Sequence, residues 1–141
     1  VLTSNQGWNV QQNVSYLKEI IKKIKTNTNR VCLFINPDPT IIKYVIDTQA
    51  HAIELFTGEY ADTFSTNKID SVIKKYIKTA NKAYESNIGV NAGHDLNLDN
   101  LKFFNQSITY LDEVSIGHAL ICDSLYYGLE NTIQLYKRNL I

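Results

Sequence analysis

The sequence contains no methionine and only two cysteines. Because no initiator is present, and because the first residues read as a loop entering a helix, we expect the chain to be the C-terminal part of a longer protein. Cys32 lies in an apolar run and Cys122 on a helical pattern. Neither has partners at a metal-ligand spacing, so both are predicted to be buried, reduced thiols.

The chain also lacks an excess of charge of either sign, with 14 Lys and Arg against 14 Asp and Glu. Such a balance provides no field that would gather nucleic acid or an anionic membrane surface. No apolar run approaches the ~18–20 residues needed to span a bilayer. We therefore expect neither a nucleic-acid partner nor a membrane partner.

What the sequence does contain is a regular alternation of two patterns. Apolar runs of strand length cover residues 31–36, 52–56, 88–93 and 111–117. Helical patterns cover 10–24, 39–46, 69–84, 96–104 and 118–141, the last interrupted near Gly128, and 57–66 reads as a loop. The strand runs are continuously apolar and do not alternate, which is typical of parallel strands covered by helices.

This alternation predicts an α/β fold with four parallel strands. A (β/α)8 TIM barrel typically needs ~250 residues, so 141 residues suit its C-terminal half. Nothing in the composition marks a linker, and we treat residues 1–141 as a single partial domain. An open doubly wound sheet is the structural alternative.

In parallel α/β folds the ligand lies at the carboxyl ends of the strands, because the loops that follow the strands emerge there. Glu54 stands in such a strand, in "HAIELFTG", between Ile53 and Leu55. A charge in a buried run is costly unless it is paired or faces a polar cavity. A structural carboxylate paired with a neighbouring strand is the alternative; we favour a carboxylate that faces the site.

Two of the three histidines, His94 and His118, follow a glycine at the ends of successive strands, in "GVNAGHDL" and "VSIGHAL". Histidine exchanges a proton near neutral pH. Glycine lets the backbone approach a ligand, and amides at a helix start bind phosphate oxygens. His51, at the amino end of a strand, is read as a surface residue. The pattern predicts one site where a phosphorylated small molecule meets a proton-transfer group.

Three motifs in order, "IELFTGEYAD", "VNAGHDLNLDNL" and "VSIGHALICDSLYYGLENTI", resemble the pyridoxine 5'-phosphate synthase family. The likeness runs in register from about Leu2 to the end of the chain. It implies a cytoplasmic, homo-oligomeric TIM-barrel enzyme of vitamin B6 biosynthesis, a synthase of the transferase class. Such an enzyme condenses 1-deoxy-D-xylulose 5-phosphate with 3-amino-2-oxopropyl phosphate, and the resemblance implies no metal or organic cofactor.

The resemblance also implies roles for individual residues. His94 matches the family's proton donor, and Glu54 matches its transition-state-stabilising carboxylate. Gly117 and His118 match contacts to the aminoketone phosphate. Asp95, which follows the proton donor, matches a further contact to that phosphate.

Thr3 matches the threonine that contacts the deoxyxylulose phosphate. Its loop, "TSNQGWNV", departs from the family's usual "TTEGGLDV". Phe56 stands where the family usually has histidine, and Asp95 where some members have glycine. A carboxylate beside a phosphate needs a neutralising partner.

Two other functions remain open. One is a different TIM-barrel enzyme that acts on phosphorylated sugars, although no lysine or ligand cluster stands at the strand ends. The other is a truncated, non-catalytic binding or assembly module. A half-barrel exposes two strand edges and an apolar inner face, and the fragment alone is expected to have no synthase activity.

Overall fold

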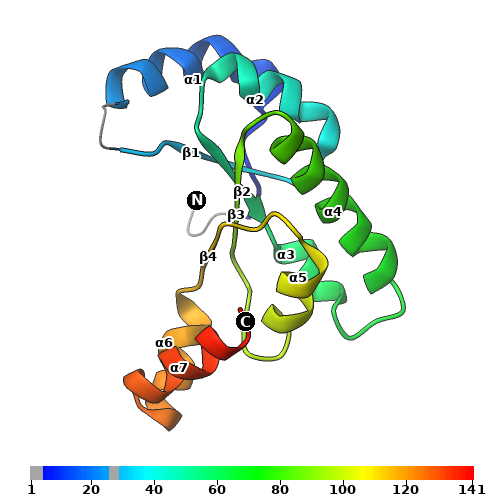
Figure 1. Ribbon diagram of the computed structural model, residues 1–141, viewed down its shortest axis with the longest axis vertical. Helices are drawn as coiled ribbons and strands as arrows, with labels where there is room; N and C mark the ends of the chain where they lie inside the picture. The colour runs from blue at the N-terminus through cyan, green and yellow to red at the C-terminus, as the bar shows by residue number, and fades with distance from the viewer. Residues whose placement is uncertain (1–4, 26–28) are drawn as a thin grey trace.

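The structure is a computed structural model that describes residues 5–25 and 29–141. Helices and strands alternate along the chain (Figure 1). In order they are α1 (Val10–Ile24), β1 (Cys32–Ile35), the 3-10 helix η1 (Pro39–Ile41), α2 (Ile42–Thr48), β2 (Ala52–Phe56), α3 (Gly58–Thr63), α4 (Ile69–Glu85), β3 (Gly89–Gly93), α5 (Leu101–Ser107), β4 (Glu113–Ser115), α6 (His118–Tyr127) and α7 (Leu129–Arg138).

The four strands form one parallel sheet in the order β1-β2-β3-β4. This confirms the predicted α/β fold of four parallel strands alternating with helices. The strands follow one another without reversal, as consecutive strands of a barrel do, whereas a doubly wound sheet reverses its strand order. The sequential order therefore favours the partial barrel over the open-sheet alternative.

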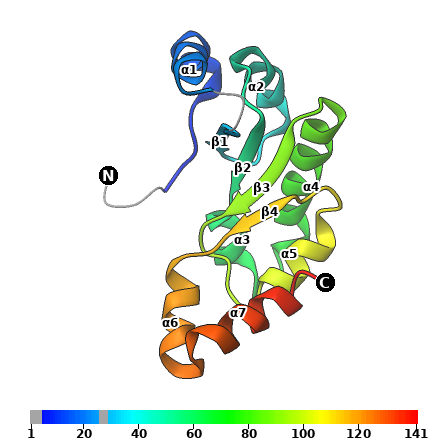
Figure 2. The same cartoon turned by 60° about the vertical axis from the view of Figure 1, so that its left-hand side comes forward.

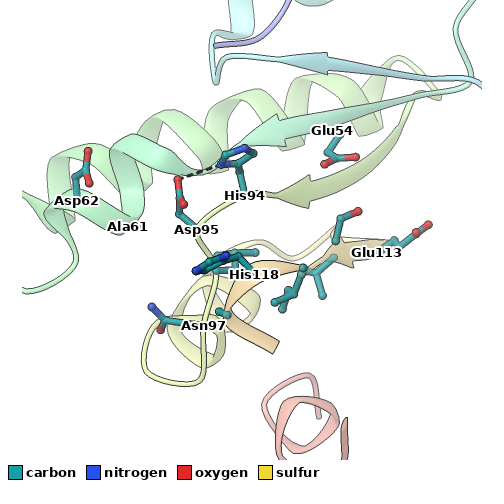
Figure 3. A pocket seen from close by; sticks show the side chains of 14 residues that line it. Glu54, Ala61, Asp62, His94, Asp95, Asn97, Glu113 and His118 are labelled. Atoms are coloured by element: carbon teal, nitrogen blue, oxygen red, sulfur yellow. Dashed lines mark hydrogen bonds and ion pairs between the residues drawn. The ribbon is translucent and has the colours of Figure 1, made fainter. Parts of the chain in front are cut away.

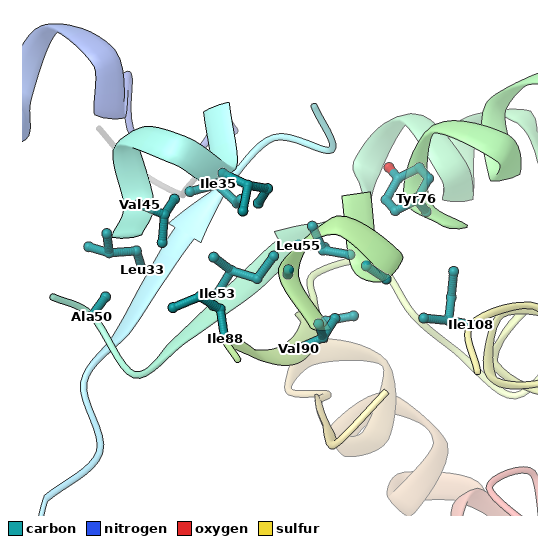
Figure 4. Packing of buried hydrophobic residues seen from close by; sticks show 14 of the residues in the cluster. Leu33, Ile35, Val45, Ala50, Ile53, Leu55, Tyr76, Ile88, Val90 and Ile108 are labelled. Carbon is teal, nitrogen blue, oxygen red and sulfur yellow. The ribbon is translucent and has the colours of Figure 1, made fainter. Parts of the chain in front are cut away.

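One face of the sheet carries the hydrophobic core. Leu33, Ile35, Ile53, Leu55 and Val90 point to this outer face and are buried (Figure 4). Side chains alternate between the faces of a strand, so the residues between them point to the opposite, inner face. The inner face is formed by Cys32, Phe34, Glu54, Phe56, Asn91, Gly93, Glu113 and Ser115.

The long helices present one apolar stripe each, as their sequence spacing predicts. In α4, Val72, Ile73, Tyr76 and Ala80 are buried. Helix α1 begins at Val10 because the Asn9 side chain accepts a hydrogen bond from the backbone of Gln12 at 3.2 Å. Helices α2 and α4 lie along the same side of the sheet (Figures 1 and 2).

Residues 57–66, predicted to be a loop, contain the short helix α3. Its anchor is Tyr60, whose ring is fully buried and packs edge-on against Phe104 with ring centroids 4.9 Å apart. The Tyr60 hydroxyl donates to the carbonyl of Asn100 at 2.6 Å. A six-residue helix held by one aromatic anchor has too few turns to show an apolar period, which is why the pattern missed it.

The prediction for the cysteines was wrong in part. Cys122 is exposed on α6, and Cys32 is only partly buried because it points to the inner face. Burial, together with the nearby Glu54 carboxylate, raises the pKa of the Cys32 thiol to about 12. His51 is partly buried, and its Nδ1 accepts a hydrogen bond from the backbone of Val31 at 2.9 Å, so it is not simply a surface residue.

The C-terminal segment is a pair of helices, α6 and α7, joined at Gly128. Gly128 has φ 78°, which L-residues with a side chain rarely adopt. The predicted interruption near Gly128 is confirmed. Among the described residues, no helix is both long and apolar enough to cross a bilayer.

Candidate functional site

The carboxyl ends of β2, β3 and β4 border an open pocket of about 920 Å³ (Figure 3). The parallel register places these ends side by side, and the loops after β3 and β4 complete the walls. All of the predicted site residues except Thr3 line this pocket: Glu54, His94, Asp95, Gly117 and His118. Thr3 lies outside the described residues. Their chemical roles stay predictions.

Glu54 occupies the inner face of β2 and is partly buried. Burial, and then the negative charge of Glu113, raise the pKa of the Glu54 carboxyl, while His94 acts in the opposite direction. Gly93 on β3 makes room for this carboxyl, because a Cβ added at Gly93 would overlap Oε1 of Glu54. Glycine at position 93 therefore allows the Glu54 side chain to extend toward the end of the sheet.

His94 and Asp95 turn sharply away from the end of β3. Both have left-handed backbones, with φ of 83° and 53°, a region that His, Asp and Asn enter more readily than other side chains. The Thr57 hydroxyl donates to the carbonyls of Gly93, at 2.8 Å, and His94. Asn100 donates to the carbonyl of Asp95 at 3.1 Å. The left-handed turn is thus held from two other segments and sets the direction of the His94 side chain.

The Asp95 carboxylate lies beside the His94 imidazole, with Oδ2 3.1 Å from Nδ1 (Figure 3). A carboxylate beside a phosphate needs a neutralising partner, and a protonated His94 would be that partner. The left-handed φ at Asp95 is a conformation that glycine also adopts without strain.

Phe56 packs against the His94 ring edge-on, with centroids 5.3 Å apart. Phe34 approaches the same ring at 6.2 Å. The imidazole therefore has an apolar wall on the β1 and β2 side and the Asp95 carboxylate on another. Phe56 therefore gives the His94 ring a packing contact and no hydrogen bond from its side chain.

Gly117 and His118 form the start of α6. Gly117 has φ −109°, and a Cβ there would meet nothing within 4 Å. Neither the backbone nor the packing of the described residues requires glycine at this position, which leaves the backbone open to the pocket. Nε2 of His118 lies 3.5 Å from Sγ of Cys122, one turn along α6.

Two other polar residues, Asn36 and Asp38, follow β1 and have structural roles. The Asn36 side chain accepts from the backbone of Gly7 at 2.9 Å. Asp38 caps η1 by accepting from the backbone and hydroxyl of Thr40 at 2.8 and 2.7 Å. They are absent from the lining of the pocket described here.

Sequence reasoning missed Glu113, which lines the pocket from β4. It lies within the predicted strand 111–117 but was not singled out as a site residue. Part of the signal was present in the alternation of side chains, which places Glu113 and Ser115 on the same face of the strand. The register then pairs Glu113 with Asn91 on β3. No group of three or more His, Cys, Asp or Glu in residues 5–25 and 29–141 is arranged to hold a metal ion.

The chain is similar over its length to known proteins of one family. A family model described as "Pyridoxal phosphate biosynthesis protein PdxJ" matches residues 1–141. A pyridoxine 5'-phosphate synthase of Cytophaga hutchinsonii is 49% identical over 139 residues, covering 99% of this chain and 58% of the relative. A protein of the same name from Parabacteroides distasonis is 46% identical, covering 96% of this chain and 57% of the relative.

The chain thus spans somewhat more than half of the length of these relatives. The range that the family model matches nonetheless contains all four strands and the segments that line the pocket. The chain belongs to the pyridoxal phosphate biosynthesis protein PdxJ family.

Proposed function

We propose that the complete protein is a pyridoxine 5'-phosphate synthase. It would condense 1-deoxy-D-xylulose 5-phosphate with 3-amino-2-oxopropyl phosphate to give pyridoxine 5'-phosphate, inorganic phosphate and water. The single observation that carries the proposal is the meeting of Glu54, His94 and His118 in one pocket, in a chain of this family. Glu54 lies within β2, His94 follows β3 and His118 follows β4, so the fold brings together side chains from three separate βα units.

His94 is the proposed proton donor. Addition of an amine to a ketone and loss of water require a proton at the departing oxygen, and a positioned imidazole can supply it. Support comes from the turn that fixes His94 and from Asp95, whose carboxylate would stabilise the protonated ring. Glu54, in its ionised form, is the proposed stabiliser of cationic intermediates.

The aminoketone phosphate is proposed to bind at Gly117, His118 and Asp95. Backbone amides at the start of a helix bind phosphate oxygens well, and α6 starts at the pocket. The open space above Gly117 supports a backbone contact there. Thr3 is proposed, on the family resemblance alone, to contact the deoxyxylulose phosphate.

For the complete protein we also propose a TIM barrel of which residues 1–141 are the C-terminal portion, a homo-oligomeric state and a cytoplasmic location. The sequential strand order and the polar residues on the inner face support the barrel. The equal numbers of acidic and basic residues support the absence of a nucleic-acid partner. The isolated chain is proposed to be inactive as a synthase.

The proposal is tested with a fusion protein. It carries the part of the Cytophaga hutchinsonii relative that the match leaves uncovered, joined to this chain in the order that the relative has. We expect the fusion to form pyridoxine 5'-phosphate from the two substrates. A folded fusion that binds both substrates without turnover would instead support the non-catalytic module, and turnover of other phosphorylated sugars alone would support a different barrel enzyme.

A further inference from the structure

The middle of the inner face carries a row of polar side chains that the proposed mechanism does not fully use. Register pairs Glu54 on β2 with Asn91 on β3, and Asn91 with Glu113 on β4. Residues in register on parallel strands point to the same face. Two carboxylates therefore flank one carboxamide across three neighbouring strands.

Asn91 is the buried member of this row, with 6% of its surface exposed. Its Nδ2 donates to Oε2 of Glu113 at 3.3 Å. Its Oδ1 is buried and has no hydrogen-bond partner among the described residues. A buried oxygen without a partner is costly, and its neighbour in register on the side away from Glu113 is Glu54.

Glu113 is also fixed from its other side. Nη1 of Arg30 lies 3.8 Å from Oε2 of Glu113. The same guanidinium pairs with Asp112 at 3.0 Å, and Asp112 accepts a further bond from the backbone of Val90 at 2.9 Å. Glu113 is thus held in place on the edge strand, although its side chain remains largely accessible to water.

We propose that Asn91 and Glu113 are positioning residues for Glu54. Glu113 supplies a second negative charge across the sheet, and Asn91 both fixes that charge and offers its Oδ1 to a protonated Glu54. Together they decide whether Glu54 meets a substrate as an acid or as a carboxylate. The catalytic part of this inference rests on the proposed function.

The sign of the effect follows from simple electrostatics. A like charge disfavours the ionised carboxyl, and a hydrogen bond to the neutral form also favours that form. The Glu113 charge and the Asn91 hydrogen bond therefore both raise the pKa of Glu54, in the same direction as burial. The positive group that opposes this rise is His94, after β3. Arg30, on the β1 side, pairs with Glu113, and Cys32 on β1 stays a neutral thiol.

The test is a carbon-13 NMR titration of the glutamate carboxyls in this chain. The Glu54 resonance is assigned from its loss in Glu54→Gln. In Glu113→Gln we expect its midpoint to move to lower pH, and in Asn91→Ala to move the same way. Glu19→Gln, which makes the same change on the exposed face of α1, is the matched control and should leave the midpoint in place.

Glu113 is exposed, so Glu113→Gln should preserve the fold, and it decides the test even if Asn91→Ala fails to fold. An unchanged Glu54 midpoint in folded Glu113→Gln overturns the inference. A shift equal to that in Glu19→Gln also overturns it, because the effect would then reflect net charge alone.

The pH profile of kcat/KM of the fusion protein is a second measurement, and it would not shift if Glu113 had a purely structural role. If Glu54 acts as a carboxylate, the acidic limb of kcat/KM should shift to lower pH in Glu113→Gln. A uniform loss of activity without a shift overturns the catalytic part. An inactive parent fusion would overturn the proposed function, and the NMR titration would still decide the coupling of Glu54 to Glu113.

Discussion

The Thr57 hydroxyl, at the end of β2, donates to the carbonyl of His94, which follows β3. It also donates to Gly93 at 2.8 Å. The side chain after one strand therefore holds the left-handed turn that aims the proposed proton donor after the next. This link explains how the His94 side chain keeps a defined direction although its backbone has a φ of 83°.

Thr57→Val should remove these bonds while keeping the side-chain volume. The His94 carbonyl then loses this donor, whereas the Gly93 carbonyl keeps the backbone N–H of Thr57 at 3.1 Å. For the unsatisfied carbonyl we expect a loss of about 1–3 kcal/mol in the free energy of unfolding. Urea unfolding of the chain measures this, with Thr57→Ser as the variant that keeps the hydroxyl. A Thr57→Val protein as stable as the parent would show that the turn forms without it.

Gly117→Ala should separate binding from folding. A Cβ at Gly117 meets nothing, so the free energy of unfolding should stay within about 0.5 kcal/mol of the parent. The methyl group would nevertheless block a phosphate from the backbone, and we expect roughly tenfold weaker binding of pyridoxine 5'-phosphate by the fusion, or about 1.4 kcal/mol. Calorimetric titration measures the affinity.

Gly7→Ala is the contrasting substitution. A Cβ at Gly7 would overlap the backbone of Ile35, so this variant should lose stability. If Gly117→Ala binds pyridoxine 5'-phosphate as tightly as the parent, Gly117 makes no close contact with the phosphate.

Glu54→Gln should stabilise the chain near neutral pH. The pKa of Glu54 is raised in the folded state, so its contribution to stability is full below the unfolded pKa and is lost as pH rises through the folded value. Glutamine carries no charge at any pH and escapes this loss. Thermal unfolding should give a higher Tm for Glu54→Gln at pH 7 and no difference below the ordinary glutamate range. A lower Tm at pH 7 would indicate that the ionised carboxylate stabilises the fold.

The two cysteines should differ in reactivity. Cys122 is exposed, whereas burial raises the pKa of Cys32 to about 12 and keeps it a thiol. Because the thiolate is the nucleophile, iodoacetamide at pH 8 should modify Cys122 first, at least about tenfold faster. Mass spectrometry of the peptides measures both rates. Equal rates in the folded chain would contradict the partly buried environment of Cys32.

Most of the architecture was predictable because parallel strands and amphipathic helices leave strong periodic signals. The apolar runs located every strand, and the spacing from Ile69 onward located α4. Helix α3 escaped because one buried ring, Tyr60, holds it. Such tertiary anchoring leaves no period in the sequence.

The site was predictable to the extent that it lies at strand ends. Glu54, His94 and His118 were found from their positions after or within apolar runs. Glu113 and the hydroxyl of Thr57 were not, because their importance depends on register and on a hydrogen bond across strands. Residues such as Cys122 were misjudged, since an apolar helix does not reveal which of its faces is covered.

The measurement closest to the central claim is the turnover of the fusion protein with His94→Ala beside the parent and beside His51→Gln. His51 precedes β2, at the opposite end of this strand from the carboxyl end that borders the pocket, and serves as the matched histidine control. We expect His94→Ala to lower kcat by about 10²–10⁴-fold, as loss of a general acid does, and His51→Gln to retain kcat. Unchanged turnover in folded His94→Ala would contradict the account.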